Sequence, residues 1–275
     1  MTASSFVRVQ RTRAWALPDV AELWQYRDLL LLLAGRDIRL RYKQTFLGAA
    51  WAVLQPVLTM VVFSIFFGRL AQVPSDDLPY PIFSFAALLP WQLFSFALTQ
   101  SSNSLVDNAD VLTKVYFPRL VLPLASTLAG LVDFAIAFVV LIAMMFYFGV
   151  FPGWGLIVLP FLTVLAVLAA LAVGLWLSAL NVLYRDVRYA IPFLAQLWLF
   201  ITPVAYPSSL VPEPWRALYG LNPMVGVVEG FRWALLDASP PPGSMLAVSV
   251  AATLAMLAGG LFYFRRMEKT FADVI

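Results

Sequence analysis

The side chains that could do acid–base or metal chemistry in this chain are almost all carboxylates. Histidine and cysteine are both absent from its 275 residues, which removes the commonest general base and the thiolate ligands of metal sites. The 15 Asp and Glu residues are scattered, and Asp76 and Asp77 form the one adjacent pair. A phosphate-binding loop of the form GxxxxGK[ST] is also absent, so the chain itself is not expected to hydrolyse ATP. These residues predict neither a catalytic site nor a metal site.

A polar segment with the sequence VDNADVLTKVYFPRLVLP, at residues 106–123, separates two long apolar runs. Asp107 or Asn108 is expected to cap a helix here. One face of that helix would carry four apolar residues, Val111, Leu112, Val115 and Tyr116. An apolar face exposed to water predicts a docking surface for another protein. The alternative is a helix that lies flat on lipid.

The run RDIRLRYKQTFLGAAW, which begins at Arg36, concentrates basic residues just before the first apolar run. Helical spacing divides it into two faces, with Arg36, Arg39 and Lys43 on one and Ile38, Tyr42 and Thr45 roughly opposite. Arg41 breaks this pattern. Such a helix would lie in the membrane interface with its bases near lipid phosphates. The alternative is that these bases serve only to orient the chain in the membrane.

Two apolar runs carry aromatic and polar residues at helical spacing. They are Trp51, Gln55, Thr59, Val62 and Phe66 in the first run, and Gln196, Phe200 and Pro203 in the fifth. Aromatic faces can stack on sugar rings in a polar channel, although anchoring and packing explain most individual aromatics in a membrane. Gln55 and Gln196 are the stronger channel candidates, because an amide that faced lipid would be unsatisfied.

Asp133 is the one charged residue well inside an apolar run. An acid at such depth is costly and usually faces the interior of the bundle or a water-filled cavity. A functional role and a hydrogen-bonded structural role are equally compatible with the sequence. A single acid does not indicate a proton pathway.

The long connection between residues 207 and 244 contains two amphipathic patterns. In VPEPWRALYG, three residues are expected to dip into the membrane interface, namely Trp215, Leu218 and Tyr219. In NPMVGVVEGFRWALL, Gly226 and Gly230 allow close helix approach, and Glu229 and Arg232 are spaced to form an ion pair. Residues 221–236 are too short to cross the membrane and are predicted to be re-entrant or interfacial, as a gate or as a plug.

Composition places the whole chain in a bilayer. It is 62% hydrophobic and 12% charged, against roughly 25% charged in soluble domains. Hydropathy predicts six spans, at 47–68, 81–99, 119–148, 154–180, 189–206 and 245–264. The expected fold is therefore an all-α integral membrane protein with six transmembrane helices, an N-terminal amphipathic interfacial helix, a helix between spans two and three, and re-entrant helices on the outer face.

Basic residues set the expected orientation. All but three of the 18 Lys and Arg precede the first span or lie in the second connection, the fourth connection or the tail. Those that precede the first span include Arg8, Arg11 and Arg13. The three exceptions are Arg69, Arg216 and Arg232. The positive-inside rule then predicts that both termini are cytoplasmic. Because no signal peptide pattern is evident, the mature chain is expected to begin near Met1. The expected division is a tail with the amphipathic helix (1–46), a transmembrane domain (47–264) that includes outer helices (207–244), and a cytoplasmic tail (265–275).

Four segments in this order resemble a known family. They are RDIRLRYKQTFLGAAWAVLQPV, NADVLTKVYFPRLVLP, NVLYRDVRYAIPF and YGLNPMVGVVEGFRWALL. Together they resemble the permease subunit of bacterial ABC-2 type polysaccharide exporters, in the O-antigen and teichoic-acid subfamily. The resemblance covers nearly the whole chain, from Glu22 to Phe264.

The resemblance implies partners as well as a fold. The expected assembly is a homodimer that binds two copies of a soluble subunit, and ATP and Mg²⁺ bind that subunit rather than this chain. The expected substrate is a glycan or polyol phosphate on an undecaprenyl pyrophosphate carrier, moved outward across the bacterial inner membrane. Membrane lipids are further partners, and no cofactor, metal or nucleic acid is implied.

The resemblance also assigns residues to roles. A coupling helix that docks into the ATPase would comprise Asn108, Asp110, Val111, Leu112, Lys114, Val115, Phe117 and Arg119. The end of an amphipathic gate helix, at the cytoplasmic entrance where the pyrophosphate arrives, would comprise Arg36, Arg39, Tyr42 and Lys43. An outer gate would comprise Trp215, Tyr219, Glu229 and Arg232. The polar and aromatic stripes supply the expected channel lining, with Trp51, Gln55, Thr59, Phe66, Gln196 and Phe200.

Two alternatives remain open from the sequence. An ABC-2 exporter of a drug or small lipid would have a narrow apolar channel without the aromatic and amide stripes. A membrane enzyme, such as a glycosyltransferase that acts on a lipid-linked sugar, would need carboxylates clustered at one membrane face, and the acids here are scattered.

We predict that charge reversal at Asp110 or Lys114, or truncation of Leu112, uncouples export while membrane insertion is retained, because these residues lie on the expected docking helix. Surface glycan and membrane-inserted protein, measured in the same cells, test this. Normal export by a variant that lacks the whole apolar face would contradict the docking role.

Overall fold

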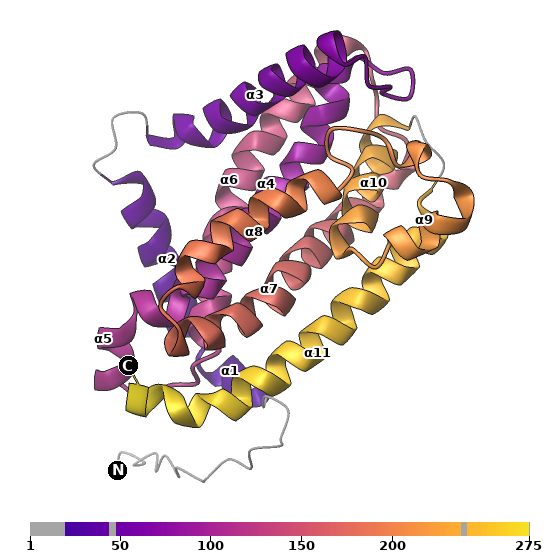
Figure 1. The fold of residues 1–275 in the computed structure, drawn as a ribbon. Coiled ribbons are helices and arrows are strands. Elements are labelled where there is room, and N and C mark those ends of the chain that lie inside the picture. Colours follow the sequence, from indigo (N-terminus) through magenta and orange to yellow (C-terminus); the bar gives the residue numbers. More distant parts are fainter. Residues whose placement is uncertain (1–19, 44–47, 238–240, 275) are drawn as a thin grey trace.

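The computed structural model describes residues 20–43, 48–237 and 241–274, and all regular secondary structure within these residues is helical (Figure 1). This confirms the predicted all-α fold for the described part of the chain. The predicted tail at 1–46 is described only from Val20 to Lys43, so Arg8, Arg11, Arg13 and Thr45 lie outside the described residues.

The helices of the basic terminal segment and the first half of the chain are α1 (Val20–Gln25), α2 (Arg27–Tyr42), η1 (Gly48–Ala50), α3 (Trp51–Phe63), the π-helix η2 (Ser64–Leu70), α4 (Tyr80–Asp107), α5 (Ala109–Lys114) and α6 (Val121–Phe148). Those of the second half are η3 (Trp154–Val158), α7 (Leu159–Leu183), α8 (Val187–Ile201), η4 (Ser208–Leu210), α9 (Glu213–Tyr219), α10 (Pro223–Leu236) and α11 (Gly243–Val274).

Five stretches of the described residues are long and apolar enough to cross a membrane. They are Trp51–Leu70, Tyr80–Asp107, Val121–Phe148, Trp154–Leu183 and Gly243–Glu268. They correspond to predicted spans one, two, three, four and six, which makes the protein a multi-pass membrane protein. The last helix, α11, continues as one helix through the predicted tail as far as Val274.

The predicted fifth span, at 189–206, is observed as a shorter helix. Helix α8 has 15 residues and ends at Ile201, and residues 202–206 are not helical. At about 1.5 Å per residue, α8 is shorter than a hydrocarbon core of roughly 30 Å. Figure 1 shows α8 running beside α4 and α7, from the end near α5 towards α10. That α8 crosses the membrane stays a prediction.

Helix α4 forms the centre of the bundle. Most of its residues are buried, and α6, α7 and α10 pack against it. Small residues make this packing close: at Gly174 of α7, an added Cβ would lie 2.0 Å from the hydroxyl oxygen of Ser101 in α4. Ala166 and Ala170, which precede Gly174 at helical spacing, are fully buried. The predicted small-residue face of the fourth span is therefore an interface between helices.

Helix α10 is enclosed by the protein. All 14 of its residues are buried, and α4, α7 and α11 pack around it. The backbone of Gly226 lies against Ser249 of α11, and that of Gly230 against Leu162 of α7, which confirms the predicted close approach. The enclosure leaves no face of α10 open to lipid. Both alternatives for its depth in the membrane, re-entrant and interfacial, stay predictions.

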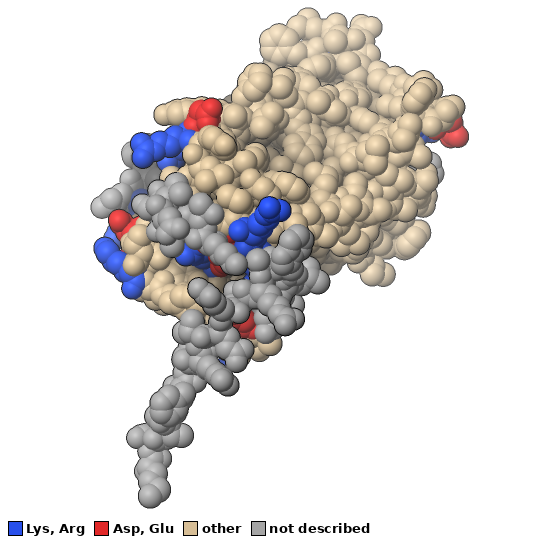
Figure 2. Space-filling model, turned by 60° about the horizontal axis from the view of Figure 1, so that its bottom comes forward, with Lys and Arg blue, Asp and Glu red and all other residues tan. Residues whose placement is uncertain are grey.

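Charged residues gather at one end of the bundle. Figure 2 shows most of the visible Lys and Arg around the end that carries α1, α2 and α5, whereas the surface beyond them is largely uncharged. We call this the basic end. The ends of α4, α7 and α11 also lie there (Figure 1). Its charge is the feature on which the predicted cytoplasmic orientation depends.

We predict that Gly226→Ala lowers the free energy of unfolding by about 1–3 kcal/mol, because the added methyl group would overlap Ser249 and the Leu246 backbone. Gly35→Ala in α2 is the matched control, since nothing lies within 4 Å of its added Cβ. Thermal unfolding of the two variants in detergent measures the difference. Equal melting temperatures would contradict the close packing of α10 on α11.

Candidate functional site

A cavity of about 520 Å³ lies between the end of α2 and helices α3, α4 and α6. Its polar and aromatic lining comprises Arg41, Tyr42, Trp51, Gln55, Thr59, Trp91, Gln92, Ser95, Phe96, Thr99, Gln100, Asp133 and Phe134. Amide and hydroxyl groups therefore stand beside aromatic rings, a combination that suits the hydroxyl groups and apolar faces of a sugar. Trp51, Gln55 and Thr59, three of the six predicted channel residues, belong to this lining.

The other three predicted channel residues do not border this cavity. Phe66 and Phe200 are 56% and 53% exposed, and Gln196 is exposed on the same helix as Phe200. Phe66 does not share the face of Trp51, Gln55 and Thr59, because α3 becomes a π-helix at Ser64. A period of 3.6 residues therefore no longer holds between Thr59 and Phe66. A channel role for Phe66, Gln196 and Phe200 stays a prediction.

Asp133 holds the end of α2 at the rim of the cavity. Its carboxylate accepts a hydrogen bond from the Tyr42 hydroxyl and pairs with Arg41, whose Nη2 lies 2.5 Å from Asp133 Oδ2. The Arg41 guanidinium also lies 4.2 Å from the ring centroid of Phe96. Burial and the Asp133 carboxylate raise the pKa of Tyr42 to about 12, so its phenol stays protonated as a donor. The acid inside the third span therefore has a definite partner, the N-terminal helix.

The predicted entrance residues of α2 are distributed differently from the expectation. Tyr42 lines the cavity, and so does Arg41, which breaks the amphipathic pattern. Arg39 and Lys43 are exposed and do not border the cavity. Arg36 is also outside the lining. The role of Arg36, Arg39 and Lys43 at an entrance for the pyrophosphate stays a prediction. The sequence did not assign Arg41 to the cavity, and its departure from the helical pattern was the available signal.

Arg36 is held by two partners. Its Nε and Nη2 donate to Asp37 Oδ1 at 3.0 and 2.9 Å, and Nη2 also donates to Asn108 Oδ1 at 2.7 Å. The amide nitrogen of Asn108 donates to the carbonyl of Ser104 at 2.9 Å, which fixes the oxygen towards Arg36. Asn108, one of the two residues predicted to cap this helix, occupies the N-cap position of α5, but its side chain makes no capping hydrogen bond. Its side chain joins the junction of α4 and α5 to α2 instead.

The predicted coupling helix exists as α5, at the basic end, but its apolar residues do not share one environment. Val111 and Leu112 pack partly against the chain's own cluster around Phe117. Val115 follows α5 and is 56% exposed, and Tyr116 is 66% exposed. Asp110 and Lys114 are exposed as well. The surface available for docking in this conformation is therefore more polar than the helical pattern predicts.

The last two predicted coupling residues contact the protein itself. Phe117 is buried at 4% exposure. Arg119 donates a hydrogen bond to the carbonyl of Glu268 in α11, and its guanidinium lies 5.7 Å from the ring centroid of Phe271. These contacts attach the chain after α5 to α11. The sequence also did not reveal the ion pair between Asp107, the last residue of α4, and Arg188 of α8, which are 2.8 Å apart.

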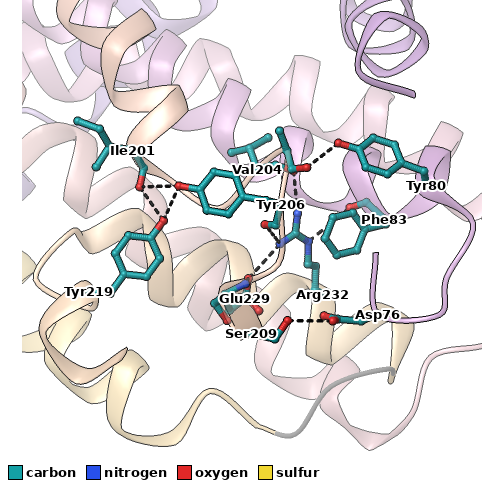
Figure 3. A network of polar contacts seen from close by, with 12 residues as sticks. Asp76, Tyr80, Phe83, Ile201, Val204, Tyr206, Ser209, Tyr219, Glu229 and Arg232 are labelled. Carbon is teal, nitrogen blue, oxygen red and sulfur yellow. Dashed lines mark hydrogen bonds and ion pairs between the residues drawn. The ribbon is translucent and has the colours of Figure 1, made fainter. Parts of the chain in front are cut away.

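A buried ion pair organises the opposite end of the bundle (Figure 3). Arg232 and Glu229 of α10 are 3.0 Å apart and almost fully buried, which confirms the predicted pairing. Arg232 also donates to the carbonyls of Val204 at 2.7 Å and Tyr206 at 3.2 Å, and its guanidinium lies over the Phe83 ring. It therefore satisfies backbone groups that α8 leaves without helical partners after Ile201.

Two tyrosines continue this network towards α9 (Figure 3). The hydroxyls of Tyr206 and Tyr219 are 2.9 Å apart, and Tyr219 donates to the carbonyl of Ile201 at 2.7 Å. Burial and the neighbouring Tyr206 hydroxyl raise the pKa of Tyr219, so it remains a neutral donor. Trp215, on the same helix, is 61% exposed. Of the predicted gate residues, three are thus engaged in the network and one faces outward; their gate role stays a prediction.

The fold defines a class: a multi-pass helical membrane protein with a polar cavity among its spans. A family model described as "ABC-2 type transporter" matches residues 28–236. The chain therefore belongs to the ABC-2 type transporter family, as a membrane subunit rather than an enzyme in itself.

Similar proteins are named for O-antigen export and for polysialic acid transport. The O-antigen export system permease protein RfbA of Myxococcus xanthus is 32% identical over 259 residues, which is 93% of this chain and 98% of the relative. A protein of the same name from Klebsiella pneumoniae is 25% identical over 90% of this chain and 95% of its own. The polysialic acid transport protein KpsM of Escherichia coli is 23% identical over 85% and 91%.

We predict that Arg232→Met destabilises the protein by about 3–5 kcal/mol, because it leaves Glu229 buried without its cation and the carbonyls of Val204 and Tyr206 without a donor. Arg188→Met is the control, because Arg188 and its partner Asp107 are both about half exposed and such pairs contribute about 0–1 kcal/mol. Thermal unfolding in detergent compares the variants. A melting temperature of Arg232→Met equal to that of Arg188→Met would refute the anchoring role.

Proposed function

We propose that this chain is the membrane-spanning subunit of an ATP-driven exporter that moves a lipid-linked polysaccharide, such as O-antigen or teichoic acid on undecaprenyl pyrophosphate, to the outer side of the inner membrane. The observation that carries the proposal is the polar cavity with aromatic walls, in a chain similar over almost its full length to export permeases of polysaccharides. In this assignment, two copies of the chain form the path, and both termini are cytoplasmic.

The cavity supports a sugar substrate over a small apolar one. Gln55, Gln92 and Gln100 offer amide donors and acceptors, while Trp51 and Trp91 offer ring faces. Such stacking suits a glycan because sugar rings have apolar faces and polar edges. A drug or small lipid would gain little from three amides, whose desolvation would remain uncompensated.

The basic end supports a role for a soluble ATPase partner. Helix α5 and the exposed residues Val115 and Tyr116 lie there, and the family to which the chain belongs is that of ABC-2 transporters. The energy for transport would come from ATP bound with Mg²⁺ on that partner. Movement of α5 would be the input that this chain receives.

We predict that Gln55→Leu lowers polysaccharide export roughly tenfold, because the substrate loses an amide partner in the wall of the cavity. Leu254→Ala is the control, since Leu254 is 54% exposed on α11 and does not border the cavity. Surface polysaccharide and lipid-linked glycan retained inside are quantified in a deletion strain that carries each variant. If deletion of the gene alone leaves surface polysaccharide unchanged but alters sensitivity to drugs, the drug-exporter alternative would be established instead.

A further inference from the structure

The junction of α4 and α5 is joined to α2 by a side-chain hydrogen bond between residues far apart in the chain, and Val111 and Leu112 of α5 belong to the same apolar cluster as Leu33 of α2. Arg36 and Asn108 are 72 residues apart, and their hydrogen bond is 2.7 Å long. Both ends of the contact are oriented by second partners, Asp37 for the guanidinium and the Ser104 carbonyl for the amide. A contact with both partners fixed in this way transmits displacement instead of absorbing it in side-chain rotation.

Helix α2 carries that displacement to the cavity. From Arg36 to Tyr42 the chain is one uninterrupted α-helix, so the two positions lie roughly 9 Å apart along a stiff rod. At its far end, Arg41 and Tyr42 bind Asp133, and both line the cavity. A shift of α2 therefore changes the rim of the cavity.

The other ion pair at the junction of α4 and α5 joins it to α8 rather than to α2. Asp107 pairs with Arg188 at the start of α8, and both side chains are about half exposed. Exposed pairs of this kind are weak, and this one does not touch α2 or the cavity. Arg36 is more enclosed, with its side chain 34% exposed. Helix α4 runs directly from this junction to the cavity, and Arg36 provides a second link, through α2, to the rim formed by Arg41, Tyr42 and Asp133.

We propose that Arg36 is the positioning residue that couples the docking helix α5 to the cavity: it transmits movement of α5 through Asn108 to α2, and thereby to the contacts of Arg41 and Tyr42 with Asp133. This rests on the proposed function, because it needs a partner that moves α5. It assigns Arg36 a mechanical role in place of the expected contact with a pyrophosphate.

The test uses the full chain in complex with its ATPase subunit, in lipid nanodiscs for hydrolysis and in cells for export. Arg36→Ala and Asn108→Ala are expected to keep ATP hydrolysis within about twofold of wild type while surface polysaccharide falls at least tenfold. The double variant should lose no more than either single one, since both remove the same contact. Asn108→Asp, which keeps an acceptor for Arg36, should retain export.

A spectroscopic signal separates transmission from mere stability. The chain has no cysteine, so Leu40→Cys, at an α2 position that is 63% exposed, gives a single labelling site, and the cysteine-free complex supplies the background. ATP with vanadate is expected to shift the fluorescence of a bimane label there, and Arg36→Ala should abolish the shift while hydrolysis continues. Arg188→Ala is the control and should keep both the shift and export.

Several results would overturn the proposal. One is a shift that persists in Arg36→Ala despite lost export, which would place Arg36 at the substrate. Normal export by Arg36→Ala would also overturn it, as would a loss of ATP hydrolysis together with export in that variant. So would additive losses of export in the double variant, or an export defect in Arg188→Ala equal to that in Arg36→Ala. If the wild-type complex hydrolyses ATP but exports no glycan, the proposed function fails, and the α2 fluorescence still tests the coupling separately.

Discussion

Backbone carbonyls that lose their helical partners inside a membrane protein must find other donors, and Arg232 supplies them where α8 ends. Residues 202–206 leave the helix, and the guanidinium donates to Val204 and Tyr206 while Glu229 balances its charge. Without these bonds, a non-helical segment beside buried α10 would be strongly unfavourable. Arg232 thus attaches α10 to the non-helical segment that follows α8.

The same principle, a buried or half-buried charge that satisfies a distant element, operates at the basic end. Asp133 lies in a span and binds both Arg41 and Tyr42 of α2. Arg36 of the same helix binds Asn108 at the start of α5. Helix α2 therefore lies between the candidate docking segment and the cavity, with polar contacts to each.

Helix α8 is one of the elements that reach both ends of the bundle. It begins beside the Asp107–Arg188 pair and ends at the network of Arg232, Tyr206 and Tyr219. Because α8 is short and the chain after it is not helical, its position depends on its contacts with other elements. Close glycine contacts around α10, by contrast, leave that helix little freedom to move.

The sequence by itself determined the features that depend on local spacing and composition. Long apolar runs established a multi-pass helical protein, and the spacing of Glu229 and Arg232 or of Gly226 and Gly230 identified contacts that the structure confirms. The position of α5 also followed from a short polar segment between two apolar runs.

Only the tertiary structure decided which bases serve which partner. Tyr42 and Asp133 are 91 residues apart, and Arg36 and Asn108 are 72 apart, so no periodicity relates them. Helical spacing placed Arg36, Arg39 and Lys43 on one face of α2, and only the packing of α2 showed that Arg41 borders the cavity. The end of α8 was equally hidden, because hydropathy does not record that a buried arginine on another helix can satisfy an unwound backbone. Periodicity reports which face of an element is apolar; the partner of each polar group depends on how the elements pack.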